Sequence, residues 1–187
     1  PEMISPDSDL YREHPDWAIH IDEREGVQSR NQMVLDLSRD EVCEYVINAV
    51  SDILANANIE YVKWDMNRQL TDMPRLGYNH EYTLGYYKIM SAITEKFPNI
   101  LFEGCSAGGG RFDAGVLAYM PQIWTSDNSD AIARLKMQYS TSMCYPVYSI
   151  SSHVTASPNH QCGRVTSLKT RADVAYCGTF GYELDVT

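Results

Sequence analysis

The sequence predicts an α/β fold in which parallel strands alternate with helices. Stretches rich in β-branched and aromatic residues alternate with stretches whose apolar residues recur at every third or fourth position. No repeat, low-complexity tract or linker rich in Pro, Gly and Ser divides the 187 residues. Strands and helices that alternate in this way form parallel sheets through right-handed crossovers. An open doubly wound sheet and a (β/α)8 barrel both satisfy this pattern.

The number of strands and the length of the chain bear on that choice. Five strands are predicted, or six if residues 33–37 form one. A whole (β/α)8 barrel needs about 250 residues, so this chain would hold most of a barrel without its first strands. An open five-stranded sheet fits the count nearly as well, and both closures stay open on this ground.

A long helix is predicted to begin at a capping box, Ser-Arg-Asp-Glu at residues 38–41, whose serine and glutamate side chains can satisfy the first backbone N–H groups. Apolar residues then recur on one face of the helix: Val42, Tyr45, Val46, Ala49, Val50, Ile53 and Leu54. Residues 59–65 are mostly β-branched and aromatic, which predicts a strand.

The remaining elements continue the alternation. A second helix carries Tyr82, Tyr86, Ile89, Met90, Ile93 and Phe97 on one face and ends at Pro98. The predicted strands that follow are 100–103, 122–126, 145–150 and 182–186. Helices are predicted near 113–119, around Ile132, Leu135 and Tyr139, and at 170–177. A glycine-rich loop, 108–110, follows the first of these strands, and a polar loop with His153 and His160 follows the third.

Composition excludes several classes of protein. No apolar run approaches the roughly 20 residues that cross a bilayer, so we expect no membrane association. The net charge of −10 and the lack of basic stretches argue against nucleic-acid binding. The five cysteines are unclustered, which indicates reduced thiols and a cytoplasmic location. Since the chain begins with Pro1 and not with Met, we expect that the natural N-terminus lies upstream.

Polar side chains gather near the carboxyl ends of three predicted strands. Strand alternation places Lys63 and Asp65 on one face, Glu103 and Cys105 on one face of the next strand, and Asp127 beyond the third. Barrel and doubly wound enzymes keep their active sites at these strand ends.

Each of these residues also has a plain structural interpretation. Asp65 can be a helix cap or a surface carboxylate, and Asp127 can cap the next helix, as can Ser129 or Asp130. Lys63 can be a surface lysine and Cys105 a small buried residue. The glycine-rich loop lacks a phosphate-binding motif, and neither His153 nor His160 has the spacing of a zinc ligand, so no metal site is expected.

Taken together, Asp65 and Asp127 lie at the ends of two strands that are separated by one other strand, so in a barrel they would face each other across its mouth. Such a pair is the minimum machinery of a glycosidase, in which one carboxylate attacks the anomeric carbon and the other protonates the departing oxygen. Lys63 would favour the ionised form of Asp65, while a second negative charge would help Asp127 to hold its proton.

The motifs resemble glycoside hydrolase family 36, the retaining α-galactosidases of bacteria and fungi. The resemblance rests on residues 61–68 (YVKWDMNR), 103–113 (EGCSAGGGRFD) and 124–130 (WTSDNSD), and also on 1–11, 30–38, 158–161 and 181–185. It covers essentially the whole chain.

The resemblance implies a partial (β/α)8 TIM barrel, from approximately the end of strand 3 through strand 8, across residues 1–187. Asp65 would end strand four as the nucleophile, and Asp127 would end strand six as the acid/base. The residues that would contact galactose are Arg30, Lys63, Trp64, Asn67 and Cys105. The family's N-terminal β-sandwich, first barrel strands and C-terminal β domain would be absent from this chain, as would an acidic pair and a tryptophan upstream of Pro1.

The expected activity is the hydrolysis of terminal α-linked galactose from melibiose and raffinose-type oligosaccharides, without cofactor or metal. The full-length protein is expected to be a homo-oligomer. Rival interpretations are a transferase of the raffinose- or stachyose-synthase kind, an α-N-acetylgalactosaminidase, a Schiff-base aldolase that uses Lys63, and a non-catalytic sugar-binding barrel fragment.

Overall fold

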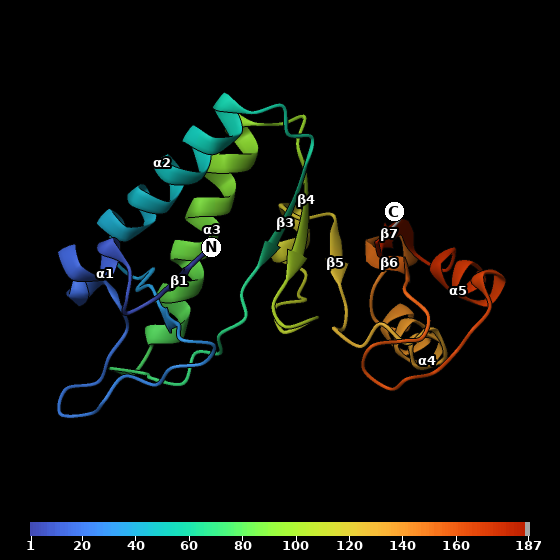
Figure 1. The fold of residues 1–187 in the computed structure, drawn as a ribbon. Coiled ribbons are helices and arrows are strands. Elements are labelled where there is room, and N and C mark those ends of the chain that lie inside the picture. The colour runs from blue at the N-terminus through green and yellow to red at the C-terminus, as the bar shows by residue number, and fades with distance from the viewer. Residues whose placement is uncertain (186–187) are drawn as a thin grey trace. The chain divides into compact units, whose positions relative to one another are not determined.

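The computed structural model describes residues 1–185. The chain divides into two compact units, Pro1–Leu101 and Phe102–Thr187. Figure 1 labels their helices and strands.

The first unit opens with a small antiparallel pair of strands. β1 (Met3–Ile4) pairs with β2 (Met33–Val34), with Met3 opposite Val34. Between them lie helix α1 (Asp9–Glu13) and a 3-10 turn, η1 (Pro15–Trp17). The possible sixth strand at 33–37 is therefore short and antiparallel, so it does not add to the parallel sheet.

Two long helices form most of the core of this unit. α2 (Asp40–Asn56) lies beside α3 (Tyr78–Lys96), as Figure 1 shows, and β3 (Tyr61–Asp65) lies between them in the sequence. The predicted apolar face of α3 is confirmed for Tyr82, Tyr86, Ile89, Met90 and Ile93, which are all buried. Phe97, also predicted on this face, is the C-cap of the helix and is half-buried. Burial of these large side chains supplies the main stabilisation of such a helix pair.

The start and the face of α2 differ from the prediction. Its N-cap is Arg39, which makes no side-chain capping bond. The hydroxyl of Ser38 donates instead to Oδ1 of Asp36 over 2.6 Å, so the predicted capping box does not form. On the helix, Val42, Cys43, Val46 and Leu54 are buried, whereas Tyr45, Ala49 and Ile53 are exposed. The buried stripe is therefore narrower than the periodicity indicates.

The second unit is built on parallel strands. β4 (Leu101–Cys105), β5 (Gln122–Trp124), β6 (Ile150–Thr155) and β7 (Thr179–Glu183) follow one another in the sheet in this order. Gly104 lies opposite Ile123, Trp124 opposite Ser151, and Thr155 opposite Glu183, all in parallel register. This confirms the predicted α/β class.

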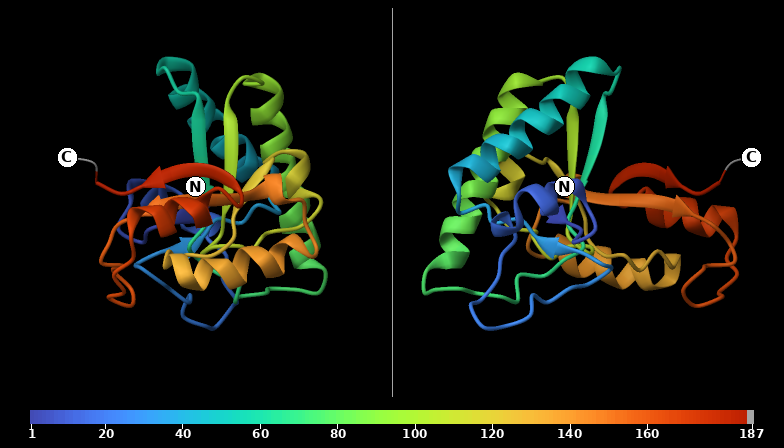
Figure 2. Two further views of the ribbon diagram at one scale, coloured as in Figure 1. Left: turned by 90° about the vertical axis from the view of Figure 1, so that its right-hand side faces the viewer. Right: turned by 60° about the vertical axis from the view of Figure 1, so that its left-hand side comes forward.

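Helices and short turns connect these strands: η2 (Val116–Ala118), α4 (Ala131–Ser142), η3 (Val147–Ser149) and α5 (Leu168–Ala175). Helices α4 and α5 lie on one side of β6 and β7, as both views of Figure 2 show. They cover the sheet as the crossover helices of parallel strands do.

Two predicted strands lie at different positions. The strand predicted at 145–150 is a 3-10 turn followed by β6, so His153 is a strand residue and not part of a polar loop. The last predicted strand, 182–186, is observed as β7, which ends at Glu183, and Val186 lies outside the described residues.

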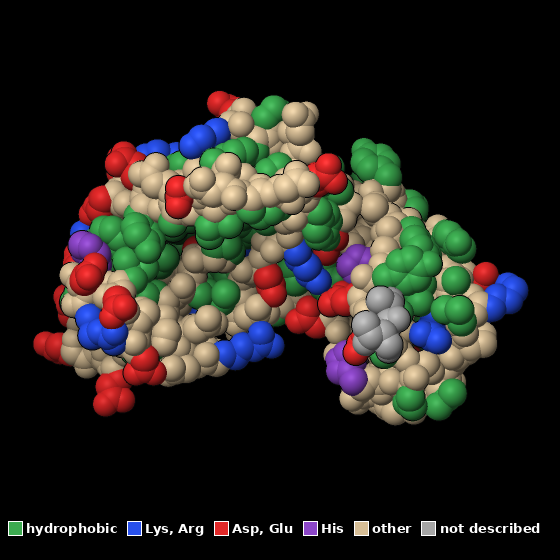
Figure 3. Space-filling view, turned by 45° about the horizontal axis from the view of Figure 1, so that its top comes forward, with side chains coloured by type: hydrophobic (Ala, Val, Ile, Leu, Met, Phe, Trp, Pro, Cys, Tyr) green, Lys and Arg blue, Asp and Glu red, His purple; other side chains and the backbone are tan. Residues whose placement is uncertain are grey.

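Helix α4 buries a polar face. The buried residues are Ala131, Arg134 and Gln138, whereas the predicted apolar face is exposed, with Ile132 at 40%, Leu135 at 50% and Tyr139 at 66%. Figure 3 shows that hydrophobic side chains also reach the surface elsewhere on the molecule, among polar and charged ones. An open cavity of about 560 Å³ lies along this face, lined by Leu135, Gln138, Tyr139, Ser142, Val147 and Cys177.

The polar face of α4 is buried because its side chains satisfy main-chain carbonyls. Arg134 donates to the carbonyls of Ser126 and Ser151, at 3.0 and 2.7 Å, and its guanidinium stacks over Trp124 at 4.1 Å. Gln138 donates to the carbonyl of Val174 over 3.0 Å. Burial lowers the pKa of the Arg134 guanidinium to about 10. Hydrogen bonding, rather than apolar packing, therefore sets the orientation of the helix.

No helix within residues 1–185 has the length and hydropathy needed to cross a membrane.

Candidate functional site

The site residues predicted from the sequence fall in both units. Arg30, Lys63, Trp64, Asp65 and Asn67 belong to the first unit. The second unit contains Cys105 and Asp127.

Asp65 is the last residue of β3, and its two carboxylate oxygens have different surroundings. Oδ2 accepts a hydrogen bond from Nδ2 of Asn67 over 2.6 Å. Oδ1 is buried and has no hydrogen-bond partner within the described residues. A buried carboxylate oxygen without a partner costs about 1–3 kcal/mol, so it needs an explanation, and a role in a reaction is one that fits a carboxylate at a strand end. Asp65 caps no helix, since the residues that follow its strand form an irregular segment.

The neighbours of Asp65 on β3 alternate as predicted. Lys63 is half-buried, whereas Trp64 is 1% exposed and points into the core. The indole Nε1 of Trp64 donates over 2.9 Å to the carboxylate of Glu2, which is itself fully buried. This charge-assisted bond fixes the strand just before Asp65.

Arg30 stands at the tip of a tight hairpin. The backbones of Ser29 and Gln32 exchange two hydrogen bonds, at 3.1 and 3.0 Å. The two residues between them, Arg30 and Asn31, have φ of 55° and 57°. Two successive positive φ values are typical of a type I′ turn, whose twist matches that of the flanking strands. The hairpin exposes the Arg30 side chain.

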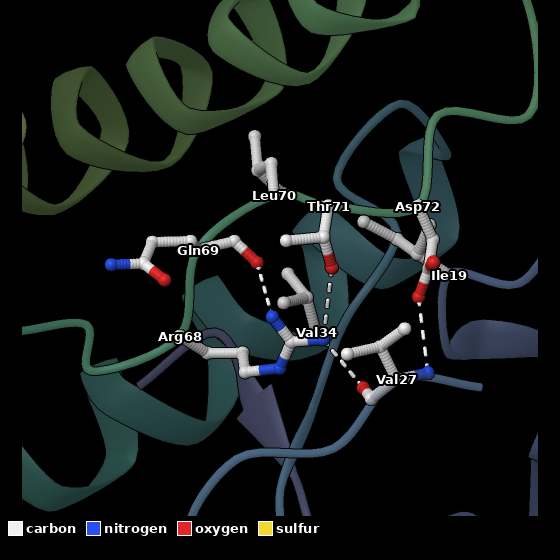
Figure 4. A pocket seen from close by; sticks show the side chains of 8 residues that line it. All are labelled: Ile19, Val27, Val34, Arg68, Gln69, Leu70, Thr71 and Asp72. Atoms are coloured by element: carbon white, nitrogen blue, oxygen red, sulfur yellow. Dashed lines mark hydrogen bonds between the residues drawn. The ribbon is translucent and has the colours of Figure 1, made fainter.

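A buried arginine ties this hairpin loop to the chain that follows Asp65. Arg68 is 5% exposed and donates to the carbonyls of Val27 and Gln69 and to the hydroxyl of Thr71. Asp72 accepts from the backbone N–H of Val27 over 3.2 Å. Figure 4 shows these contacts around a pocket of about 10 Å³, which leaves no room for a ligand. Arg68 therefore joins two loops and does not line a binding cavity.

Asp127 lies three residues after the end of β5, and its side chain is exposed. Its Oδ1 lies 4.0 Å from Sγ of Cys105, a buried residue at the end of β4. Asp127 does not cap the next helix. The N-cap of α4 is Asp130, whose carboxylate accepts from the N–H of Ala133 over 3.0 Å.

The glycine-rich loop supports the chain before Asp127. The N–H of Gly109 donates to the carbonyl of Thr125 over 3.1 Å. Gly108 has φ of 84°, and a Cβ there would lie 2.7 Å from Cα of Ser126. The glycines thus allow two backbones to approach closely.

Several residues of this neighbourhood were not singled out from the sequence as functional. Glu2, Arg68, Asn159 and Gln161 all bond to main-chain or side-chain atoms next to the predicted site residues. All four residues stand inside the quoted motifs, and that position is the only signal that pointed to them. In the described part of the chain, no group of three His, Cys, Asp or Glu side chains could hold a metal ion.

Comparison with known proteins gives consistent matches. The Melibiase family matches residues 1–187. The chain is 56% identical to the α-galactosidase AgaA of Geobacillus stearothermophilus, over 100% of this chain and 27% of that protein. It is 55% identical to the bifunctional α-galactosidase/sucrose kinase AgaSK of Mediterraneibacter gnavus, over 99% of this chain and 20% of that protein.

The structural match is equally close. A crystal structure of a variant of AgaA in complex with raffinose, described as an α-galactosidase of glycoside hydrolase family 36, superposes with a TM-score of 0.96. The match is 56% identical and covers 100% of this chain and 27% of that one. The chain thus spans about a quarter of the length of AgaA.

Proposed function

Because this chain belongs to the Melibiase family, we propose that the protein containing it hydrolyses terminal α-linked galactose with net retention. The substrate class is α-galactosides such as melibiose and raffinose-type oligosaccharides. The raffinose complex of AgaA, a protein 56% identical to this chain, supports that choice.

In this proposal Asp65 is the nucleophile. Its Oδ1 attacks the anomeric carbon and displaces the leaving group, which forms a β-galactosyl ester. Asp127 donates a proton to the departing oxygen, and then takes a proton from the water that hydrolyses the ester. Retaining enzymes hold the two carboxyl groups about 5–5.5 Å apart, and we expect that separation here.

The other predicted residues receive binding roles. Arg30, Lys63 and Asn67 would donate hydrogen bonds to the hydroxyl groups of galactose. Cys105 would stand where the substituent on C2 lies, since a small side chain there leaves room for a hydroxyl. Trp64 would form the wall behind Lys63 and Asp65.

The observation that supports the nucleophile most directly is the asymmetry of the Asp65 carboxylate. Asn67 holds Oδ2, and Oδ1 is buried without a partner. An oxygen in this state has its lone pairs available, and the bonded oxygen fixes the direction in which they point.

We also propose which part of a larger protein this chain forms. The residues would form strand 3 (its end) through strand 8 of a (β/α)8 barrel, and the remaining domains would lie elsewhere in a homo-oligomeric protein. The five free cysteines support a reducing, cytoplasmic location. The proposed reaction uses no cofactor or metal.

Substitution of the nucleophile tests the proposal. In the full-length protein, Asp65→Ala should abolish turnover of nitrophenyl α-galactoside. Azide should restore part of it, because the small anion can attack from the side that the carboxylate vacates. NMR should then identify β-galactosyl azide as the product.

Controls make this test specific. Asp52→Ala, on the exposed side of α2, should leave turnover unchanged. Turnover of the N-acetyl analogue should be far slower than that of the galactoside if Cys105 faces C2. Normal activity in the Asp65→Ala protein would end the assignment.

A further inference from the structure

We propose that Gln161 is a positioning residue for the reaction, because its side-chain amide holds the two peptide groups that directly follow Asp127. This inference rests on the proposed function, in which Asp127 is the acid/base. It concerns the segment Thr125–Ser129, called the Asp127 segment below.

The carbonyl groups of the Asp127 segment are bonded one by one to different parts of the second unit. The Thr125 carbonyl accepts from Gly109 N over 3.1 Å. The Ser126 carbonyl accepts from Arg134 over 3.0 Å, and the Ser129 carbonyl from the Thr155 hydroxyl over 2.9 Å. These bonds hold the two ends of the segment.

The centre of the segment is held by Gln161. Its Nε2 donates to the carbonyl of Asp127 over 2.9 Å, and its Oε1 accepts from the N–H of Ser129 over 3.0 Å. Because both bonds come from one planar amide, they fix the distance and the orientation of the two peptide groups together. Within the described residues, no other hydrogen bond reaches the carbonyl of Asp127.

Gln161 is itself held in place by a buried residue, Asn159, which is 5% exposed. Oδ1 of Asn159 accepts from the backbone N–H groups of Gln161 and Cys162, at 3.0 and 3.1 Å. Its Nδ2 donates to the hydroxyl of Ser129 over 3.0 Å. The loop that carries Asn159 and Gln161 is therefore joined to the Asp127 segment through both of these side chains. The amide of Gln161 is already in place before substrate binds, so its ordering costs nothing at that stage.

The side chain of Asp127 has little to hold it. It is exposed, and among residues 1–185 its carboxylate has only the 4.0 Å contact with Cys105. The position of the carboxylate must therefore come from its main chain. Loosening the Asp127 peptide would displace the group that transfers the proton.

Loss of this positioning should affect substrates unequally. A poor leaving group, such as the sugar alkoxide released from melibiose, needs the proton as its bond breaks. A dinitrophenolate leaves without one. Of the steps up to formation of the galactosyl ester, which kcat/KM measures, only proton transfer to the leaving group depends on where Asp127 stands. The two substrates therefore separate a positioning role from a general effect on folding.

The first test is Gln161→Met in the full-length protein, a change that keeps the length of the side chain and removes both hydrogen bonds. We expect kcat/KM on melibiose to fall about tenfold. With 2,4-dinitrophenyl α-galactoside, kcat/KM should stay within about twofold of the unaltered protein. On this second substrate kcat and KM should fall together, because hydrolysis of the galactosyl ester also needs Asp127.

The matched control is His160→Ala. His160 is the exposed neighbour of Gln161, and no hydrogen bond joins it to the rest of the described chain. Both substrates should be hydrolysed by this variant as by the unaltered protein. Asp127→Ala sets the upper limit of the effect, with the same pattern in a stronger form.

A second variant, Gln161→Glu, keeps the shape of the side chain. One oxygen can still accept from Ser129, but the other faces the Asp127 carbonyl, and two acceptors repel. Below the ordinary glutamate pKa of about 4.3 the introduced carboxyl gains an O–H donor. The activity of this variant on melibiose, relative to the unaltered protein, should therefore rise as the pH falls toward that value.

The outcomes separate the two proposals. An equal fall on both substrates in Gln161→Met, or no fall on either, would overturn the positioning role while the proposed function stands. A pH-independent activity ratio for Gln161→Glu would also count against it. If the unaltered full-length protein hydrolyses neither substrate, the proposed function fails, and this inference fails with it.

Discussion

Asn67 donates a hydrogen bond to one oxygen of Asp65 over 2.6 Å and leaves the other oxygen, which is buried, without a partner in residues 1–185. The two residues are separated by one position at the end of β3. The amide thereby selects which lone pairs of the carboxylate remain available and holds the plane of the carboxyl group.

Removing this amide should slow the reaction without unfolding the protein. Asn67→Leu keeps the size of the side chain and removes the donor. We expect kcat on nitrophenyl α-galactoside to fall about 100-fold, because a misplaced nucleophile loses much of its orientation advantage. Asn56→Leu, at the exposed end of α2, is the control and should keep normal turnover. Normal kcat in Asn67→Leu would show that Asp65 does not depend on its neighbour.

Gly108 should tolerate no side chain, because it lies against the main chain of the Asp127 segment. A Cβ there would lie 2.7 Å from Cα of Ser126 and 3.1 Å from N of Asp127, at φ of 84°. Gly108→Ala should cost about 2 kcal/mol or more in unfolding free energy and should also lower turnover.

Gly77 provides the comparison for that prediction. Its φ is 81°, but a Cβ there would meet nothing within 4 Å. Gly77→Ala should therefore show the backbone strain alone, about 1 kcal/mol, with normal turnover. Chemical denaturation of both variants measures the difference, and equal losses of stability would mean that the close approach to Ser126 is unimportant.

Tyr78 should make stability depend on alkaline pH. The residue is 1% exposed, and its hydroxyl donates to Oδ1 of Asp36 over 2.7 Å. Burial and this hydrogen bond raise the pKa of Tyr78 well above its usual value of 10.0. The folded state therefore keeps the phenolic proton at pH values where the unfolded chain releases it, so this contribution to stability is complete below about pH 10 and is lost as the pH rises further.

The variant Tyr78→Phe measures this contribution. At neutral pH it should be less stable by about 1–3 kcal/mol, because it lacks the hydrogen bond to a carboxylate. Above about pH 10 the gap to the unaltered protein should narrow by up to about 1.4 kcal/mol per pH unit. Tyr139→Phe, at a 66% exposed position, should show neither effect. A gap that stays constant with pH would contradict the assignment.

The sequence predicted the elements with strong periodicity and failed where polar groups determine the packing. The apolar face of α3 is buried as expected, because five large side chains at helical spacing leave one orientation that removes them from water. Helix α4 carries a similar pattern but buries Arg134 and Gln138, because these side chains satisfy carbonyls of Ser126, Ser151 and Val174. No periodicity reports such long-range hydrogen bonds.

Long-range hydrogen bonds also limited the prediction of where helices begin. Ser38 has the spacing of a capping residue, yet its hydroxyl bonds to Asp36, which also accepts from the distant Tyr78. The sequence left Asp127, Ser129 and Asp130 as candidates for the N-cap of α4, and the structure assigns that position to Asp130. In both helices, the N-cap depends on which hydrogen-bond partners the folded chain brings near the candidate residues.

The sequence by itself determined the chemistry available to this protein: two aspartates after β-strands, the lysine and asparagine beside the first, and motifs that resemble one family of glycosidases. Tertiary structure decided which atoms of those residues are occupied. It placed Asn67 on one oxygen of Asp65 and the amide of Gln161 on the two peptide groups that follow Asp127. The physical reason is that residue types set what a group can do, whereas hydrogen bonds between residues as far apart as 127 and 161 exist only after the chain has folded.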